Sequence, residues 1–192
     1  MIRLTALLIC AALASCATAP GSGQPPAAST VFTLWTPGLA DGTKLGIEYS
    51  GNVKSNPNCV GQNRAPALAW TNVPAGTASL AIIVHDQQGR GGLGAAHWVA
   101  YGIDPALTGF AENEISQPSA RFVGGNTVLN TPTYVGPCPP ANTGLHYYQF
   151  TVIATDLDRN ALPAGLSLPE LLGRLEGGHA KAAASTVLRF GR

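Results

Sequence analysis

Short apolar segments separated by turn residues run through most of the chain after residue 30. They are rich in Val, Ile, Tyr, Phe and Trp, and clusters of Pro, Gly and Asn lie between them, which is typical of β-strands joined by turns. The pattern therefore predicts a mostly antiparallel β-fold. The predicted strands are residues 31–36, 45–49, 67–71, 80–85, 97–103, 147–155 and 186–190.

One amphipathic helix is predicted near the C-terminus. Ser167 and Glu170 have the spacing of a capping box, and Pro169 stands in the first turn, where its missing N–H costs nothing. Four leucines between residues 168 and 175 follow at helical spacing and would line one face, before a pair of glycines ends the helix. A second short helix is predicted over residues 180–184.

Two segments are less regular. Residues 108–142 show little patterning, and a segment of that length in a compact domain is usually functional or partly structured. Residues 89–94, GRGGLG, have the glycine spacing of a dinucleotide-binding loop, but such a loop must open a helix that receives the pyrophosphate. The residues that follow are β-rich, so the pattern predicts a flexible connection between adjacent strands. Asp86 and His97, which flank it, are then expected near the same end of the sheet.

The N-terminus has the layout of a bacterial export signal over residues 1–15, with Arg3, an apolar run of roughly ten residues and then small residues. The run is shorter than the about twenty residues of a spanning helix, so a transmembrane anchor is the weaker interpretation. Residues 13–16, Leu-Ala-Ser-Cys, resemble a lipobox, in which Cys16 is acylated and becomes the first mature residue. An ordinary signal peptide is the alternative.

If Cys16 carries the lipid, residues 16–30 form a flexible tether to the membrane and residues 31–192 form the folded domain. Ala17 follows the cysteine where an aspartate would indicate retention in the inner membrane. By resemblance to enterobacterial lipoproteins, the expected location is therefore the cell envelope, anchored in the outer membrane and facing the periplasm.

The charge content bears on nucleic-acid binding, and the cysteine content bears on a disulfide. Charged residues make up only 11% of the chain, and without Arg3 there are ten basic and ten acidic residues, which gives no electrostatic case for nucleic acid. With Cys10 lost in the signal and Cys16 acylated, Cys59 and Cys138 remain. A disulfide between them could stabilise the fold by roughly 4 kcal/mol in the chain-entropy model. Two separate thiols are the alternative, because two cysteines alone fix no geometry.

Several motifs follow one another in order, and among them are NCVGQN at 58–63, HWV at 97–99, GPCPP at 136–140 and GLHYY at 144–148. Their order resembles that of the phosphatidylethanolamine-binding proteins, most closely the bacterial branch often called Raf kinase inhibitor-like. The likeness covers nearly all of residues 31–192. It implies two antiparallel sheets with C-terminal helices and a small pocket for anions such as the phosphate headgroup of a phospholipid.

The same resemblance assigns six residues to the lining of that pocket. Imidazole, phenol and loop N–H groups can donate hydrogen bonds to phosphate oxygens. A carboxylate would repel an anion, so the aspartate is expected to orient a histidine and stabilise its protonated form. For each residue, the alternative is a structural polar group. The six residues are Asp86, His97, Gly136, Cys138, His146 and Tyr148.

Some positions depart from the family or stay outside the expected site. Where the family commonly has Asp-Pro-Asp-Ala-Pro, residues 86–90 lack the second acid and both prolines, and Arg90 adds a cation at the pocket mouth. His85 should point to the opposite face from Asp86, because side chains alternate along a strand. His179 follows the predicted helix, where a cation favours the helix dipole.

Three functions follow as hypotheses. The first is a lipid-anchored module that binds a small anionic or phosphorylated ligand, with no catalysis, cofactor or metal. The second is a protein-interaction module, or an inhibitor of a protease or kinase, whose protein partner is unknown. The third is an enzyme that uses Asp86, His97 and His146 as an acid–base set or as metal ligands. The sequence has neither a Gly-x-Ser-x-Gly elbow nor a His-Glu-x-x-His motif to support the third.

Overall fold

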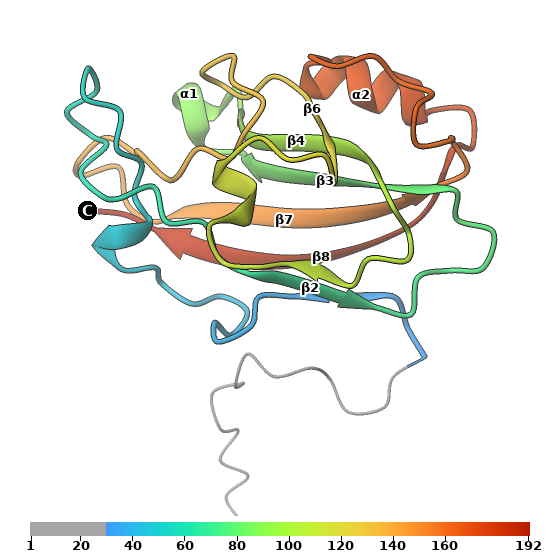
Figure 1. The fold of residues 1–192 in the computed structure, drawn as a ribbon. Coiled ribbons are helices and arrows are strands. Elements are labelled where there is room, and N and C mark those ends of the chain that lie inside the picture. Colours follow the sequence, from blue (N-terminus) through green and yellow to red (C-terminus); the bar gives the residue numbers. More distant parts are fainter. Residues whose placement is uncertain (1–29) are drawn as a thin grey trace, which may run out of the picture.

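The computed structural model describes residues 30–192, which fold into two antiparallel β-sheets packed face to face (Figure 1). This confirms the predicted mostly β-fold. The signal peptide and Cys16 lie outside the described residues. The smaller sheet has the order β1-β2-β5, made of Thr33–Trp35, Leu68–Thr71 and Gly109–Phe110. The larger has the order β6-β4-β3-β7-β8, made of Val123–Gly124, Ala95–Ile103, Ser79–Asp86, His146–Thr155 and Ala180–Phe190.

Strand β3 lies at the centre of the larger sheet and is buried on both faces, which explains its almost continuous apolar sequence. Because side chains alternate along a strand, Leu80, Ile82 and Val84 pack in the core between the sheets. Ala81 and Ile83 face the other way, into a second core beneath the helix α2. Figure 1 shows α2 beside the larger sheet, on the side away from β2.

Helix α2 spans Leu168–Leu175, as the leucine spacing predicts. The N–H of Ser167 donates to Glu170 Oε2 at 2.8 Å, and the Ser167 hydroxyl accepts from the N–H of Glu170, which completes the capping box. Leu171 and Leu175 are buried against β3 and β4. The helix therefore closes the outer core of the larger sheet.

Two predicted elements are wrong. Residues 45–49 contain a 3-10 helix, η1 (Ile47–Tyr49). Leu45 N donates to Arg189 O on β8 at 2.7 Å, but the carbonyl of Glu48 accepts from the N–H groups of residues 62 and 64 in a loop, so the segment does not continue as a strand. Residues 180–184 belong to β8, so that one C-terminal helix is present in the described chain where two were expected. Their alanines favour a helix by intrinsic propensity, but pairing with β7 decides the conformation.

The weakly patterned segment from 108 to 142 holds β5, the 3-10 helix η2 (Glu114–Ser116) and β6. Much of the rest is attached to β4 by single hydrogen bonds, including Gly125 N to Val99 O at 2.8 Å and Val128 N to Ala96 O at 2.7 Å. The segment thus follows β4 and brings residues 136–140 to the end of β3 and β7.

Candidate functional site

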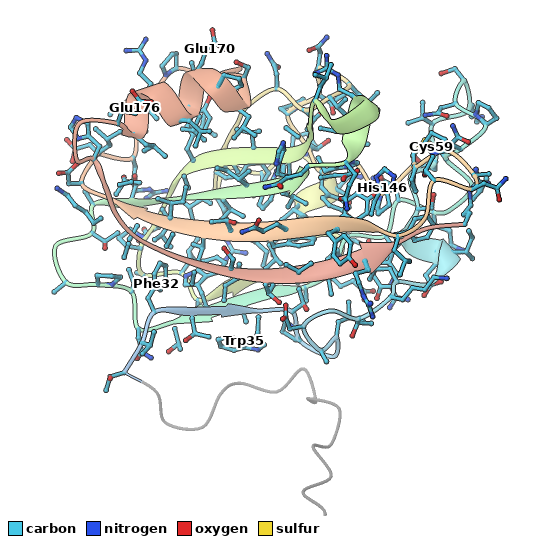
Figure 2. The ribbon with its side chains drawn as sticks, turned by 180° about the vertical axis from the view of Figure 1, so that it is seen from behind. Phe32, Trp35, Cys59, His146, Glu170 and Glu176 are labelled. Atoms are coloured by element: carbon cyan, nitrogen blue, oxygen red, sulfur yellow. A yellow bond between two sulfur atoms is a disulfide. The ribbon has the colours of Figure 1, made fainter. Side chains whose placement is uncertain are left out.

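A pocket of about 530 Å³ lies at the end of β3 and β7 that carries Asp86 and His146. All six residues predicted from the sequence line it. Figure 2 shows two of its lining residues, His146 and Cys59, at this end of the molecule and away from Glu170 and Glu176, which mark α2 and its C-terminal cap. The fold therefore brings the predicted residues together, although their binding role stays a prediction.

Strand pairing places the first three polar groups. Asp86 on β3 pairs directly with Tyr148 on β7, and His146, two residues before Tyr148, lies on the same face. His146 Nδ1 is 2.7 Å from Asp86 Oδ2, and both side chains are buried. The other oxygen, Asp86 Oδ1, accepts the N–H of Gln88 at 2.9 Å. Asp86 therefore orients His146, as expected of it.

Both ring nitrogens of His146 have hydrogen-bond partners in the protein. Thr143 Oγ1 donates to the carbonyl of Pro140 at 2.8 Å and lies 3.1 Å from His146 Nε2. Since the hydroxyl has one proton, Nε2–H must donate to Oγ1. Nδ1 hydrogen-bonds to Asp86 Oδ2 at 2.7 Å. With both nitrogens occupied, His146 supports the pocket and has no free N–H for a ligand.

His97 reaches the pocket through a β-bulge. Val84 pairs with Trp98 and His85 with Ala96, which leaves His97 as the extra residue of β4. Simple alternation would place His97 with Val99, under α2. Instead its ring packs edge-on against the ring of Tyr148, with 5.0 Å between centroids.

The chemistry of His97 differs from that of His146. Its Nδ1 lies 2.7 Å from the carbonyl oxygen of Val135, which can only accept, so Nδ1 carries the proton. Burial lowers the pKa of His97, and the neutral ring is therefore favoured. The remaining nitrogen, Nε2, has no protein hydrogen-bond partner among the described residues. His97 consequently offers the pocket an acceptor, where the sequence-based expectation was a donor.

Tyr148 supplies an unpaired donor. Its hydroxyl is buried and has no hydrogen-bond partner among the described residues, although the residue lines the pocket. Burial, reinforced by the negative charge of Asp86, raises the pKa of Tyr148 well above its usual range, so the hydroxyl keeps its proton. A buried unpaired hydroxyl costs roughly 1–3 kcal/mol, and a ligand oxygen would recover part of that cost.

One side of the pocket, which we call the disulfide wall, consists of residues 50–61 and 136–140. Cys59 and Cys138 are joined by a disulfide, with Cα atoms 4.7 Å apart, and both line the pocket. A Cβ on Gly136 would overlap the carbonyl oxygen of Tyr49, so only glycine fits there. The N–H of Gly136 donates to Asn63 Oδ1 at 2.7 Å and is not available to a ligand, contrary to expectation. Gly136 therefore shapes the pocket.

The opposite side, the glycine wall, consists of residues 88–94 and includes the short turn α1 (Gly89–Gly92) between β3 and β4. The predicted connection between adjacent strands is confirmed. Arg90 and Gly91 have left-handed φ angles of 55° and 71°. Arg90 lines the pocket and is exposed. Among the described residues that line the pocket, Arg90 is the one with a permanent positive charge and Asp86 is the one with a carboxylate.

Two other histidines lie outside the pocket lining, as expected. The ring of His85 packs near Gly94, and His179 Nδ1 is 2.7 Å from Asp156 Oδ1. Sequence reasoning missed Thr143 and the carbonyl of Val135, which hold His146 and His97. A hydroxyl three residues before a histidine gives no periodic signal, and a backbone carbonyl gives none at all.

Residues 30–192 contain no group of three or more His, Cys, Asp or Glu side chains placed to hold a metal ion. None of the helices in this range is long and apolar enough to cross a membrane.

The fold and pocket define a two-sheet β-protein with a partly polar cavity at one end of its larger sheet. The family model for phosphatidylethanolamine-binding protein matches residues 35–190. The chain belongs to this family, and the match covers almost the whole described domain.

Individual relatives agree. A Mycobacterium tuberculosis protein named as a candidate lipoprotein, LppC, is 36% identical over 156 residues, which are 80% of this chain and 66% of LppC. A Methanothermobacter thermautotrophicus protein named UPF0098 is 35% identical over 129 residues, 66% of this chain and 83% of the relative. The crystal structure of Escherichia coli YbcL, titled a member of the mammalian family, matches with a TM-score of 0.73 at 24% identity, over 84% of this chain and 98% of YbcL. This last likeness concerns the fold alone.

Proposed function

We propose that the chain is a binding protein that takes a small phosphate-bearing ligand, such as a phosphate or a phospholipid headgroup, into the pocket between the two walls. The observation that carries the proposal is the buried Tyr148 hydroxyl, which lines the pocket without a partner beside the unpaired Nε2 of His97. Both atoms are polar and have no hydrogen-bond partner among the described residues, and the Tyr148 hydroxyl is buried. Family membership supports the same reading, because the family is named for binding a phospholipid.

Binding accounts for the site better than catalysis does. Asp86 and His146 hydrogen-bond to each other and to Gln88 and Thr143, so neither is free to move a proton to or from a substrate. Val128 and Leu129 add partly exposed apolar side chains to the lining, which suits the carbon portion of a headgroup.

The predicted lipid tether at residues 16–30 also implies a location for the protein. We propose that acylation of Cys16 anchors the domain in the cell envelope, in the outer membrane facing the periplasm. The lipobox and the name of LppC support this. Cys16→Ser should release the protein from the membrane fraction, whereas recovery of that variant in the membrane fraction would contradict the proposal.

Ligand binding is tested by calorimetry on the purified full chain with inorganic phosphate and O-phosphoethanolamine. Tyr148→Phe should weaken binding by about tenfold or more, because a hydrogen bond to a charged group is lost. Without ligand it should not lower stability, because the hydroxyl has no protein partner.

Tyr101→Phe is the matched control. Its hydroxyl donates to the carbonyl of Pro163 at 2.7 Å on the α2 side, so its loss should lower stability and leave affinity unchanged. If neither compound binds wild type at millimolar concentration, or if Tyr148→Phe binds as tightly as wild type, the proposal is wrong.

A further inference from the structure

Exposed apolar side chains gather around the mouth of the pocket. Val128 and Leu129 line the pocket and are exposed to solvent. Val60 and Leu93 are also exposed, and each lies within two residues of a lining residue, on the disulfide wall and the glycine wall respectively. Leu93 is 79% exposed, more than any other large apolar side chain in the described part of the chain. We call these four residues the apolar rim.

The fold brings the segments of the rim to one end of the molecule. Val128 N donates to Ala96 O at 2.7 Å, and β4 begins at Ala95, directly after the glycine wall. Figure 1 shows α1 and the teal segment at residues 50–61 at the same end, and α2 at the other. Single exposed apolar side chains are common on proteins, whereas a group of them around a pocket mouth is typical of a surface that contacts a membrane or a protein.

The charge around the mouth favours a membrane. The segments that form it, residues 50–61, 88–94 and 125–143, contain two basic side chains, Lys54 and Arg90, and no Asp or Glu. Both cations are exposed, whereas the carboxylate of Asp86 is buried inside the pocket. Apolar side chains flanked by cations suit a bilayer with anionic lipids, because the former enter the acyl boundary while the latter stay among the headgroups. A protein interface is typically anchored by aromatic side chains, and the rim has none.

Resting on the proposed function, we infer that the apolar rim docks the domain on a bilayer that contains anionic lipids, and that the pocket takes its phosphate-bearing ligand from that surface. In the docked state Leu93 enters the boundary between headgroups and acyl chains, and Lys54 and Arg90 lie among the lipid phosphates. The pocket mouth then opens onto the headgroup layer. The ligand is therefore the headgroup of a membrane lipid rather than a phosphate free in solution.

A tryptophan placed in the rim tests the contact with lipid. Vesicles of equal parts phosphatidylethanolamine and phosphatidylglycerol should shift the emission of full-chain Leu93→Trp to shorter wavelength, because indole prefers the membrane interface. Lipids brominated along their acyl chains should quench that emission. Leu172→Trp, at a 44% exposed position on α2, is the matched control and should show neither change.

The two variants share the three native tryptophans and the same N-terminal residues, so a difference between them reports the rim and not the predicted anchor. Identical spectra of Leu93→Trp with and without vesicles would overturn the inference. Equal changes in Leu93→Trp and Leu172→Trp would overturn it as well, because contact would then not be specific to the rim.

Removal of the two cations tests the requirement for anionic lipid. Lys54→Gln/Arg90→Gln in the Leu93→Trp chain should reduce the spectral change at least about twofold, and vesicles of phosphatidylcholine alone should reduce it similarly. Arg174→Gln, on α2, is the control that should leave the change as it was. An undiminished change in the double variant would contradict docking on an anionic surface.

Competition by vesicles tests the source of the ligand. In calorimetry, the same vesicles should weaken binding of O-phosphoethanolamine to wild type at least about threefold, because lipid headgroups then occupy the pocket. The weakening should be smaller for Leu93→Ser and unchanged for Leu172→Ser. Without vesicles Leu93→Ser should bind O-phosphoethanolamine as wild type does, since Leu93 does not line the pocket.

The outcomes separate the inference from the proposed function. If O-phosphoethanolamine binds wild type and vesicles do not weaken that binding, the inference is wrong and the proposed function stands. If neither inorganic phosphate nor O-phosphoethanolamine binds in the absence of vesicles, the proposed function fails, and the source of the ligand fails with it.

Discussion

The two walls of the pocket are built differently. The disulfide wall is cross-linked by Cys59–Cys138 and by hydrogen bonds between distant segments, including Ser50 Oγ to Pro137 O at 2.7 Å and Gly51 N to Pro137 O at 3.0 Å. The glycine wall is held by its own backbone, with Gly94 N donating to Gly89 O at 3.0 Å, and by one hydrogen bond from a distant segment, Tyr147 N to Gln88 Oε1 at 3.1 Å. A Cβ on Gly91 or Gly92, at the tip of the turn, would meet no atom within 4 Å, whereas one on Gly89 or Gly94, at its base, would lie 2.6 Å from a side chain.

This difference assigns the position of the polar atoms to one wall and the positive charge to the other. The disulfide wall holds Val135 and Gly136, and with them the orientation of His97, so its shape determines the polar atoms of the pocket. The glycine wall contributes the charge of Arg90 from a turn with few long-range contacts. Changes in the first wall should therefore cost stability, and changes in the second should mainly alter ligand preference.

Removal of the disulfide should have the largest effect. Cys59→Ala/Cys138→Ala frees two residues 79 positions apart and should lower the free energy of unfolding by roughly 4–5 kcal/mol in the chain-entropy model. Urea unfolding under oxidising conditions measures the change, and chemically reduced wild type should match the variant. A loss below about 1 kcal/mol would mean that the disulfide wall does not depend on its cross-link.

Alanine in place of a glycine compares the walls directly. Gly136→Ala should lower the free energy of unfolding by about 1–3 kcal/mol, because the new Cβ collides with the backbone at Tyr49. Gly91→Ala adds only the strain of its left-handed φ, about 1 kcal/mol, since the surrounding space is open. Equal losses in urea unfolding would remove the distinction between the walls.

Acid should weaken the fold through His97. Its pKa lies below the usual 6.5 in the folded chain, so the unfolded chain takes up a proton that the folded chain does not as the pH falls below 6.5. The free energy of unfolding should therefore decrease from pH 6.5 down to the lowered pKa and then stop changing through this group. Urea unfolding at pH 7 and pH 5 should show a smaller decrease for His97→Gln than for wild type, and identical decreases would count against the neutral ring.

Arg90 should give the smallest effect on the fold. Arg90→Gly removes a side chain from a left-handed position and should leave stability within about 1 kcal/mol of wild type. Phosphate affinity should fall about twofold to fivefold at low salt and less at high salt, as for an exposed charge pair. Arg174→Ala, on α2, is the control that should bind like wild type. A large loss of stability would show that the glycine wall is as constrained as the other.

The sequence predicts the parts of the fold that depend on local pattern. The capping box of α2, the apolar β3 and the alternation that puts His146 and Tyr148 on one face of β7 follow from the period of the side chains. It misassigns residues 180–184, because alanine favours a helix locally and only pairing with β7 makes it a strand. The prediction for residues 45–49 fails similarly, since the sequence cannot show that only Leu45 hydrogen-bonds to a strand before the chain turns into a 3-10 helix.

The site, like the fold, has features that the sequence predicts and features that only the structure shows. The family resemblance that the sequence motifs carry implied that Asp86, His97, Gly136, Cys138, His146 and Tyr148 would lie around one pocket, and all six line the pocket in the structure. The tertiary structure decided what each atom does. The bulge turns His97 toward Tyr148, the carbonyl of Val135 accepts a hydrogen bond from His97 Nδ1, and Thr143 and Asp86 hydrogen-bond to the two nitrogens of His146. The physical reason is that a hydrogen bond depends on the position of its partner in space, and these partners are between three and sixty residues away along the chain.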